Sequence, residues 1–85
     1  MKINNLINCF EGAKKGKARY VGVKIVMPKC PSPEVIINEY PNFDSKLEYY
    51  KNAYSEDLSL KACEDIKIIG FTYGNSFAQI QKDLF

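Results

Sequence analysis

Residues 66–73, which read IKIIGFTY, are the part of the sequence that decides the fold. Isoleucine, phenylalanine, threonine and tyrosine favour an extended backbone, so this stretch predicts a β-strand. A strict period of two places Ile66 and Ile68 on one face. The opposite face then also carries apolar side chains, those of Ile69, Phe71 and Tyr73. Apolar residues on both faces predict an interior strand, or one whose second face meets a helix or a partner.

Three further strands are predicted around this one. Residues Arg19–Met27 alternate with a period of two and have one apolar face, formed by Val21, Val23, Ile25 and Met27. Residues Glu34–Tyr40 are rich in β-branched side chains, and a proline-rich connection separates the two segments, which pair most simply as an antiparallel hairpin. Residues Leu58–Lys61 predict a short strand. Residues Cys63–Asp65 are expected to form a polar turn before residue 66.

Three amphipathic helices complete the predicted pattern, because apolar residues recur in each at helical spacing. The first is expected to be capped by Asn4 and stopped by Gly12. The second is expected to run from a cap at Asn42 to near Ser55, and the third begins with a capping box at Ser76–Gln79. The apolar stripes of the three helices are Ile3, Leu6, Ile7 and Phe10; Phe43, Leu47, Tyr50 and Tyr54; and Phe77, Ile80 and Leu84.

The predicted elements follow one another in the order α-β-β-α-β-β-α. Two hairpins in this order indicate an α+β fold, in which helices pack on a small, mainly antiparallel sheet of about four strands. A chain of 85 residues with no internal repeat and no linker is expected to form a single domain over residues 1–85.

Charge and hydropathy narrow the classes of function. Twelve basic and ten acidic residues give a net charge of +2, which does not by itself argue for binding to nucleic acid. No apolar run approaches the roughly 20 residues that cross a bilayer. Asparagines interrupt the N-terminal segment, so no secretory signal is predicted. We therefore expect a cytoplasmic protein with no membrane partner.

The sequence lacks the histidine-based arrangements of many catalytic sites. Histidine is absent, which excludes Ser–His–Asp and Cys–His arrangements within one chain. Cys9, Cys30 and Cys63 are too widely spaced for a metal-binding or redox pair, and we expect three reduced thiols. The carboxylate pairs at residues 56–57 and 64–65 are expected to point apart into water. The sequence thus predicts no enzyme, no cofactor, and no catalytic or metal-binding residue.

A basic segment and several tyrosines are the candidates for binding. The segment Ala13–Lys17 is expected to be a glycine-punctuated loop whose lysines, with Arg19, could follow a phosphate backbone or hold an anion; a solvated loop is the favoured alternative. Six tyrosines are too many for the core of so short a chain, and tyrosine is enriched at interfaces and in ligand pockets. The candidate binding residues are Lys14, Lys15, Lys17, Arg19, Tyr20, Tyr49 and Tyr54.

Parts of the sequence resemble known groups of proteins. Residues 42–54, 57–61 and 66–71 look like small uncharacterised proteins encoded by phages and prophages of low-GC Gram-positive bacteria, and the strand Tyr20–Val26 shares this similarity. The opening residues 1–7 also resemble the start of some small anti-CRISPR proteins, a group that is strongly acidic, unlike this chain. Neither resemblance carries a catalytic or ligand-binding residue over to this sequence.

These resemblances imply a phage-type accessory protein that binds and inhibits a bacterial factor, with a defence component as the candidate target. It would occupy the surface of a host protein or sequester a nucleotide-type signal molecule, and in one variant a homo-oligomer traps the signal between its subunits. The alternative is a small nucleic-acid-binding protein that uses the basic segment Lys14–Arg19.

Overall fold

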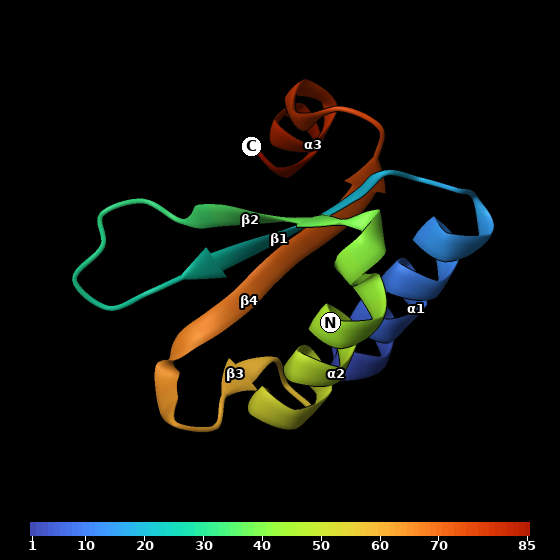
Figure 1. Cartoon of the computed structure of the whole chain (residues 1–85). Coiled ribbons are helices and arrows are strands. Elements are labelled where there is room, and N and C mark those ends of the chain that lie inside the picture. Colours follow the sequence, from blue (N-terminus) through green and yellow to red (C-terminus); the bar gives the residue numbers. More distant parts are fainter.

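Four antiparallel strands form one sheet, in the order β2-β1-β4-β3, in the computed structural model (Figure 1). The structure describes residues Met1–Phe85. The strands are β1 (Tyr20–Val26), β2 (Glu34–Glu39), β3 (Ser59–Leu60) and β4 (Cys63–Gly74). The helices are α1 (Ile3–Lys15), α2 (Phe43–Ala53), α3 (Phe77–Leu84) and the 3-10 turn η1 (Tyr40–Asn42). The predicted α+β class and the predicted order of elements are therefore confirmed.

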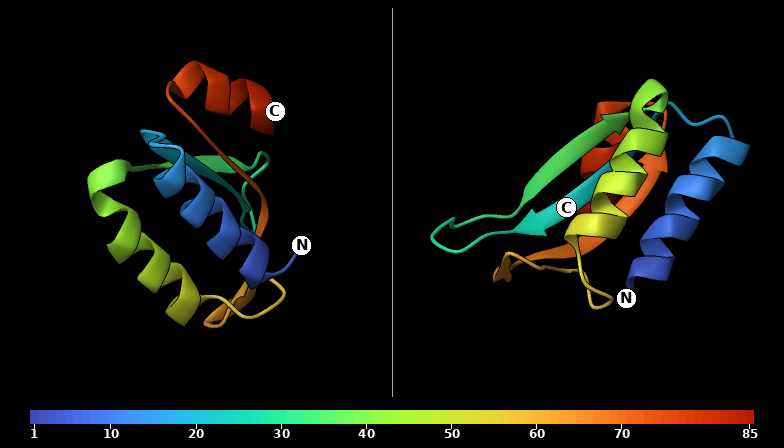
Figure 2. Two further views of the ribbon diagram at one scale, coloured as in Figure 1. Left: turned by 90° about the vertical axis from the view of Figure 1, so that its right-hand side faces the viewer. Right: turned by 60° about the horizontal axis from the view of Figure 1, so that its bottom comes forward.

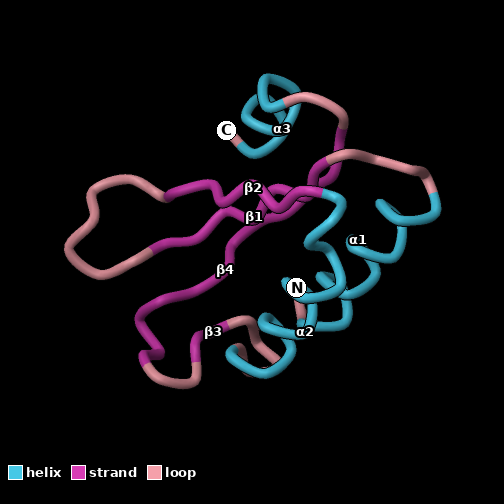
Figure 3. The backbone as a smooth tube through the Cα atoms, viewed as in Figure 1, coloured by secondary structure: helices cyan, strands magenta, loops and turns pink.

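The helices cover the two faces of the sheet unequally. Helices α1 and α2 lie on one face, which we call the helix-pair face, and α3 lies on the other, the α3 face (Figure 2). The loop between β1 and β2 reaches away from all three helices, as the tube in Figure 3 shows. No helix combines the length and the apolar character that a membrane span requires.

The main core lies between the sheet and the helix pair. Strand β1 contributes the valine and isoleucine side chains that alternation predicted, and they meet the apolar stripes of α1 and α2. The ring of Phe10 lies 5.6 Å from that of Phe43 and 6.0 Å from that of Tyr50, so one aromatic cluster joins the two helices. Other fully buried core side chains are Leu6, Ala13, Val21, Val23, Leu58 and Ile68.

A bulge in β4 changes which way its side chains face. Lys24 pairs with Gly70, whereas the next residue of β1, Ile25, pairs with Ile68, so Ile69 is one extra residue. As a result, Ile68 and Phe71 both pack against the main core. The prediction that these two side chains lie on opposite faces is wrong, because a strict period of two does not survive an inserted residue. The predicted interior position of this strand is confirmed.

Helix α1 is longer than its sequence pattern predicted. It starts at Ile3, and the carboxamide oxygen of Asn5 accepts a 2.7 Å hydrogen bond from the backbone amide of Lys2, so Asn4 does not cap it. It also continues through Gly12. A Cβ atom on Gly12 would lie 3.3 Å from the ring of Tyr73, so the glycine gives this ring room rather than ending the helix.

The start of β4 and the caps of α2 and α3 can also be compared with the predictions. Residues Cys63–Asp65 belong to β4 and are not a turn. The side chain of Asn42 does not cap α2; the backbone carbonyl oxygen of Asn42 accepts a 3.1 Å hydrogen bond from the Ser45 hydroxyl instead. The predicted cap before α3 is confirmed in part: the Ser76 hydroxyl accepts a 3.1 Å hydrogen bond from the amide of Gln79, but the return bond from the Gln79 side chain that would complete a capping box is not formed.

Candidate functional site

A groove of about 690 Å³ lies at one end of the sheet, where β1 begins and β2 ends. We call it the end groove. Its volume falls within the range of pockets that bind small molecules. Two separate segments of the chain form it, and the lining residues are Lys17, Ala18, Arg19, Tyr20, Glu39, Tyr40 and Pro41.

Backbone hydrogen bonds hold the two segments of the groove together. The amide of Tyr40 donates to the carbonyl oxygen of Arg19 at 2.9 Å, directly beyond the last strand pair, Tyr20 with Glu39. The amide of Arg19 donates to the side-chain oxygen of Asn75 at 3.1 Å. The end groove is therefore anchored to β2 on one side and to the end of β4 on the other.

The turn between α1 and β1 places the basic residues Lys17 and Arg19 at the groove. Helix α1 stops at Gly16, and Lys17 adopts the left-handed conformation with a φ of 56°. The next residue, Ala18, is buried, and its amide donates to the carbonyl oxygen of Ala13 at 2.9 Å. The buried alanine fixes the turn to the core, and the residues on either side of it reach the groove.

Two tyrosine rings give the groove its aromatic character. The ring of Tyr20 packs edge-on against Phe77 of α3, with 4.9 Å between the ring centroids. The ring of Tyr40 packs against Phe43 at 5.4 Å, yet 54% of this tyrosine remains exposed. The guanidinium carbon of Arg19 lies 5.7 Å from the centre of the Tyr20 ring. Each tyrosine ring therefore packs against a phenylalanine ring and also lines the groove.

The charges in the groove have no ion-pair partners. The structure contains two ion pairs, Lys2 with Glu56 at 3.6 Å and Lys14 with Asp44 at 2.7 Å, and neither involves a groove residue. The cations of the groove, Lys17 and Arg19, are therefore free to bind an anion, and Glu39 is free to accept hydrogen bonds.

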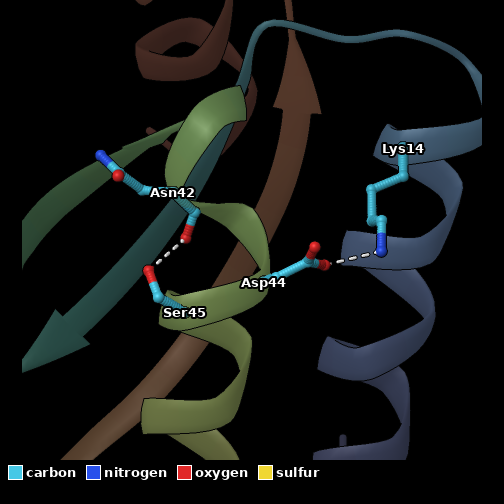
Figure 4. A network of polar contacts seen from close by, with 4 residues as sticks. All are labelled: Lys14, Asn42, Asp44 and Ser45. Carbon is cyan, nitrogen blue, oxygen red and sulfur yellow. Dashed lines mark hydrogen bonds and ion pairs between the residues drawn. The ribbon is translucent and has the colours of Figure 1, made fainter.

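The predicted basic loop is divided by the end of α1, so the expectation of one continuous loop is wrong. Lys14 and Lys15 belong to the last turn of the helix. Figure 4 shows that Lys14 points toward α2 and pairs with Asp44. Because the carboxylate accepts a hydrogen bond from the ammonium group and attracts its charge, the pKa of Lys14 is raised. Only Lys17 and Arg19 of the predicted basic residues line the groove.

The two predicted tyrosines of the α2 region lie away from the groove. Tyr49 is 52% exposed, and its ring packs against Tyr50 at 5.3 Å and Tyr54 at 6.4 Å. Tyr54 is only 5% exposed, and burial raises the pKa of its hydroxyl. Tyr54 is therefore part of the core, and Tyr49 is an exposed residue on a different surface.

Sequence reasoning missed the two residues of the groove that add a carboxylate and a second aromatic ring, Glu39 and Tyr40. Both come next to the site only through the register of the β1–β2 hairpin, which places Tyr20 opposite Glu39. The available signal was Pro41, which stops the strand and therefore fixes where the hairpin ends.

The residues that could support catalysis or metal binding do not converge in the end groove. No three His, Cys, Asp or Glu side chains gather in a way that could hold a metal ion. Burial raises the pKa of Cys9 to about 11, so its thiol is protonated at neutral pH. Asp57 lies in a polar hollow with Glu56 and Glu64, and its pKa is lowered because Ser59 donates two hydrogen bonds to it, from its hydroxyl at 2.6 Å and its amide at 3.1 Å.

No protein-family model matches this chain, and neither a curated protein nor a solved structure matches it. The arrangement of side chains in the end groove is therefore the basis on which a function can be argued. That arrangement combines two unpaired cations, one unpaired carboxylate and two accessible tyrosine rings.

Proposed function

We propose that this protein is a non-catalytic binding protein whose end groove takes up a nucleotide-type ligand and withholds it from a bacterial factor. The observation that carries the proposal is the meeting of Arg19 and Lys17 with two tyrosine rings in a groove of small-molecule size. This is the sequestering form of the inhibitor that the resemblance to phage accessory proteins implies, and it would operate in the host cytoplasm.

The groove offers a complementary group for each part of a nucleotide. The guanidinium of Arg19 can donate two parallel hydrogen bonds to a phosphate, and the ammonium group of Lys17 adds a second positive charge. The exposed ring of Tyr40 offers a flat surface on which a base can stack, an interaction worth about 1–3 kcal/mol per base. Binding of such a ligand makes and breaks no covalent bond.

The same geometry favours a small nucleotide over a nucleic-acid strand. A strand needs a continuous row of cations along its phosphates. Here Lys14 is paired with Asp44, and the carboxylate of Glu39 interrupts the positive charge within the groove itself. The unpaired cations that could bind phosphate are therefore confined to one end of the sheet, which suits a small ligand better than a strand.

A second candidate function is contact with a host protein through α2. Its support is Tyr49, a large side chain that is half exposed while its ring rests on the buried rings of Tyr50 and Tyr54. A rigidly supported aromatic side chain of this kind is typical of residues that contribute most to protein interfaces.

The nucleotide proposal is tested by isothermal titration with AMP, GMP, CMP and UMP. We expect at least one nucleotide to bind the unmodified protein, and Arg19→Ala to weaken that binding about 10-fold or more, because a charge-assisted hydrogen bond is lost. Tyr40→Ala is expected to weaken it as well, through the lost stacking surface.

Matched controls are available on α2. Tyr49→Ala removes a tyrosine of nearly the same exposure as Tyr40, and Lys46→Ala removes an exposed cation outside the groove. Both are expected to leave nucleotide affinity unchanged. The proposal fails if no nucleotide binds the unmodified protein, or if Tyr49→Ala weakens binding as much as Tyr40→Ala does.

A further inference from the structure

We infer that Glu39 makes the end groove selective for guanine among the common bases, an inference that rests on the nucleotide binding proposed above. Glu39 is the last residue of β2 and lies opposite Tyr20 in the strand register. Residues that face each other across an antiparallel pair project their side chains from the same face of the sheet, so the carboxylate stands beside a tyrosine ring.

The carboxylate of Glu39 is a free hydrogen-bond acceptor. It takes part in neither of the two ion pairs, and no side-chain hydrogen bond of the structure involves it. An ionised carboxylate can accept hydrogen bonds but cannot donate one. Whatever fills this part of the groove must therefore present donors to it.

Together, the charges of the groove require a ligand with two chemically different ends. A bare phosphate would be attracted by Arg19 and Lys17 but repelled by Glu39. A ligand that places an anion at the two cations and N–H groups at the carboxylate satisfies all three side chains at once. No other hollow of the molecule combines cations, a carboxylate and aromatic rings.

Among the bases, guanine alone presents two adjacent N–H donors on its pairing edge, at N1 and at the exocyclic N2. These match the two oxygens of a carboxylate in the side-by-side geometry that carboxylates prefer with paired donors. Adenine and cytosine each present one amino donor next to a ring nitrogen acceptor, and that acceptor would face a carboxylate oxygen. Uracil presents a single N–H between two carbonyl groups.

The test is to titrate GMP, IMP and AMP into the unmodified protein and into Glu39→Gln. IMP keeps the N1 donor of guanine and lacks the N2 amino group, so it measures the contribution of the second donor. We expect GMP to bind about 10-fold or more tightly than AMP, because a bidentate contact is lost with adenine, and IMP to fall between them.

Glu39→Gln should reverse or abolish this preference. The glutamine amide accepts one hydrogen bond and donates one, which suits the amino group and the ring nitrogen of adenine and opposes the paired donors of guanine. The matched control is Glu34→Gln, which makes the same change at the other, exposed end of β2. That control should keep the preference for GMP.

The outcomes separate this inference from the proposed function. If AMP and GMP bind equally, or if Glu39→Gln keeps the preference for GMP while Arg19→Ala still weakens binding, the assignment of guanine selectivity to Glu39 is overturned and nucleotide binding stands. If none of the three nucleotides binds the unmodified protein, both are overturned. A preference for GMP that Glu39→Gln removes and Glu34→Gln keeps supports both.

Discussion

The two faces of the sheet pack in opposite ways. On the helix-pair face, β1 presents Val21 and Val23 to a core that is built from large apolar and aromatic side chains. On the α3 face, the same strand presents Gly22 between Tyr20 and Lys24, and Ile80 is the one fully buried side chain of α3. The helix pair is thus held by many side chains, whereas α3 is held by the closeness of its approach to the backbone. A single strand therefore builds both kinds of contact by alternating valine with glycine.

The α3 face owes its close packing to glycine. A Cβ atom on Gly22 would lie 2.3 Å from the Cγ2 methyl of Ile80, a distance far too short for two non-bonded carbon atoms. Polar contacts at the end of the helix help to hold it, because the ammonium group of Lys24 donates a 2.6 Å hydrogen bond to the carbonyl oxygen of Leu84. The same ammonium group lies 4.3 Å from the centre of the Phe85 ring.

The largest expected effect comes from truncating one buried side chain on each face. Phe10→Ala removes the ring that joins α1 to α2 and should lower the free energy of unfolding by about 3–5 kcal/mol. Ile80→Ala should cost about 2 kcal/mol, the low end for this change, because Ile80 lies outside the main core cluster. Urea unfolding followed by circular dichroism measures both. An equal or larger cost for Ile80→Ala would contradict the unequal packing of the two faces.

A second prediction concerns the stability of the protein at alkaline pH, which depends on a buried tyrosine of the helix-pair face. Burial raises the pKa of Tyr50 to about 12, while its hydroxyl makes only a long, 3.5 Å hydrogen bond to the side chain of Asn38. In the unfolded chain the pKa of tyrosine is about 10, so above that pH the unfolded state loses its proton first. Stability should therefore fall as the pH rises from about 10 to about 12, by up to about 2–3 kcal/mol.

Tyr50→Phe provides the control for this pH dependence. Phenylalanine fills nearly the same space and cannot ionise, so the loss of stability in alkaline solution should become smaller. Some of it should persist, because burial also raises the pKa of Tyr54. Urea unfolding at a series of pH values gives the comparison, and an unchanged pH profile in Tyr50→Phe would show that Tyr50 is not buried as described.

The smallest of these effects tests the glycine contact of the α3 face. Gly22→Ala should destabilise the protein by about 1–3 kcal/mol, because an extra methyl group is forced into a packed interface. Gly70→Ala, whose nearest neighbour is a leucine methyl at 3.4 Å, should cost less. Ile80→Leu removes the clashing methyl group, so the cost of Gly22→Ala should shrink when the two changes are combined. Additive costs would mean that this contact does not limit the approach of α3.

The comparison also shows which parts of the fold were accessible from the sequence. The β1–β2 hairpin, the order of the elements and the cap at Ser76 follow from local patterns, and the structure confirms them. The bulge at Ile69 and the helical position of Gly12 depend on contacts between distant segments. A local sequence pattern therefore cannot predict either feature.

The candidate site was accessible from the sequence only in part. Lys17, Arg19 and Tyr20 are neighbours in the sequence, so a basic and aromatic segment could be recognised there. The second wall of the groove depends on the hairpin register, which joins Glu39 and Tyr40 to that segment. Tyr54 was grouped with the binding residues although its helical spacing already indicated the core, and the structure places it there.

The central claim, that the end groove is the binding site, can be tested most directly by titrating GMP into the ¹⁵N-labelled protein and recording backbone amide chemical shifts. We expect the amide signals of residues 17–20, 39 and 40 to shift together along one saturable binding curve, while those of residues around Tyr49 do not shift. Shifts that gather on α2, or spectra that do not change at any GMP concentration, would contradict it.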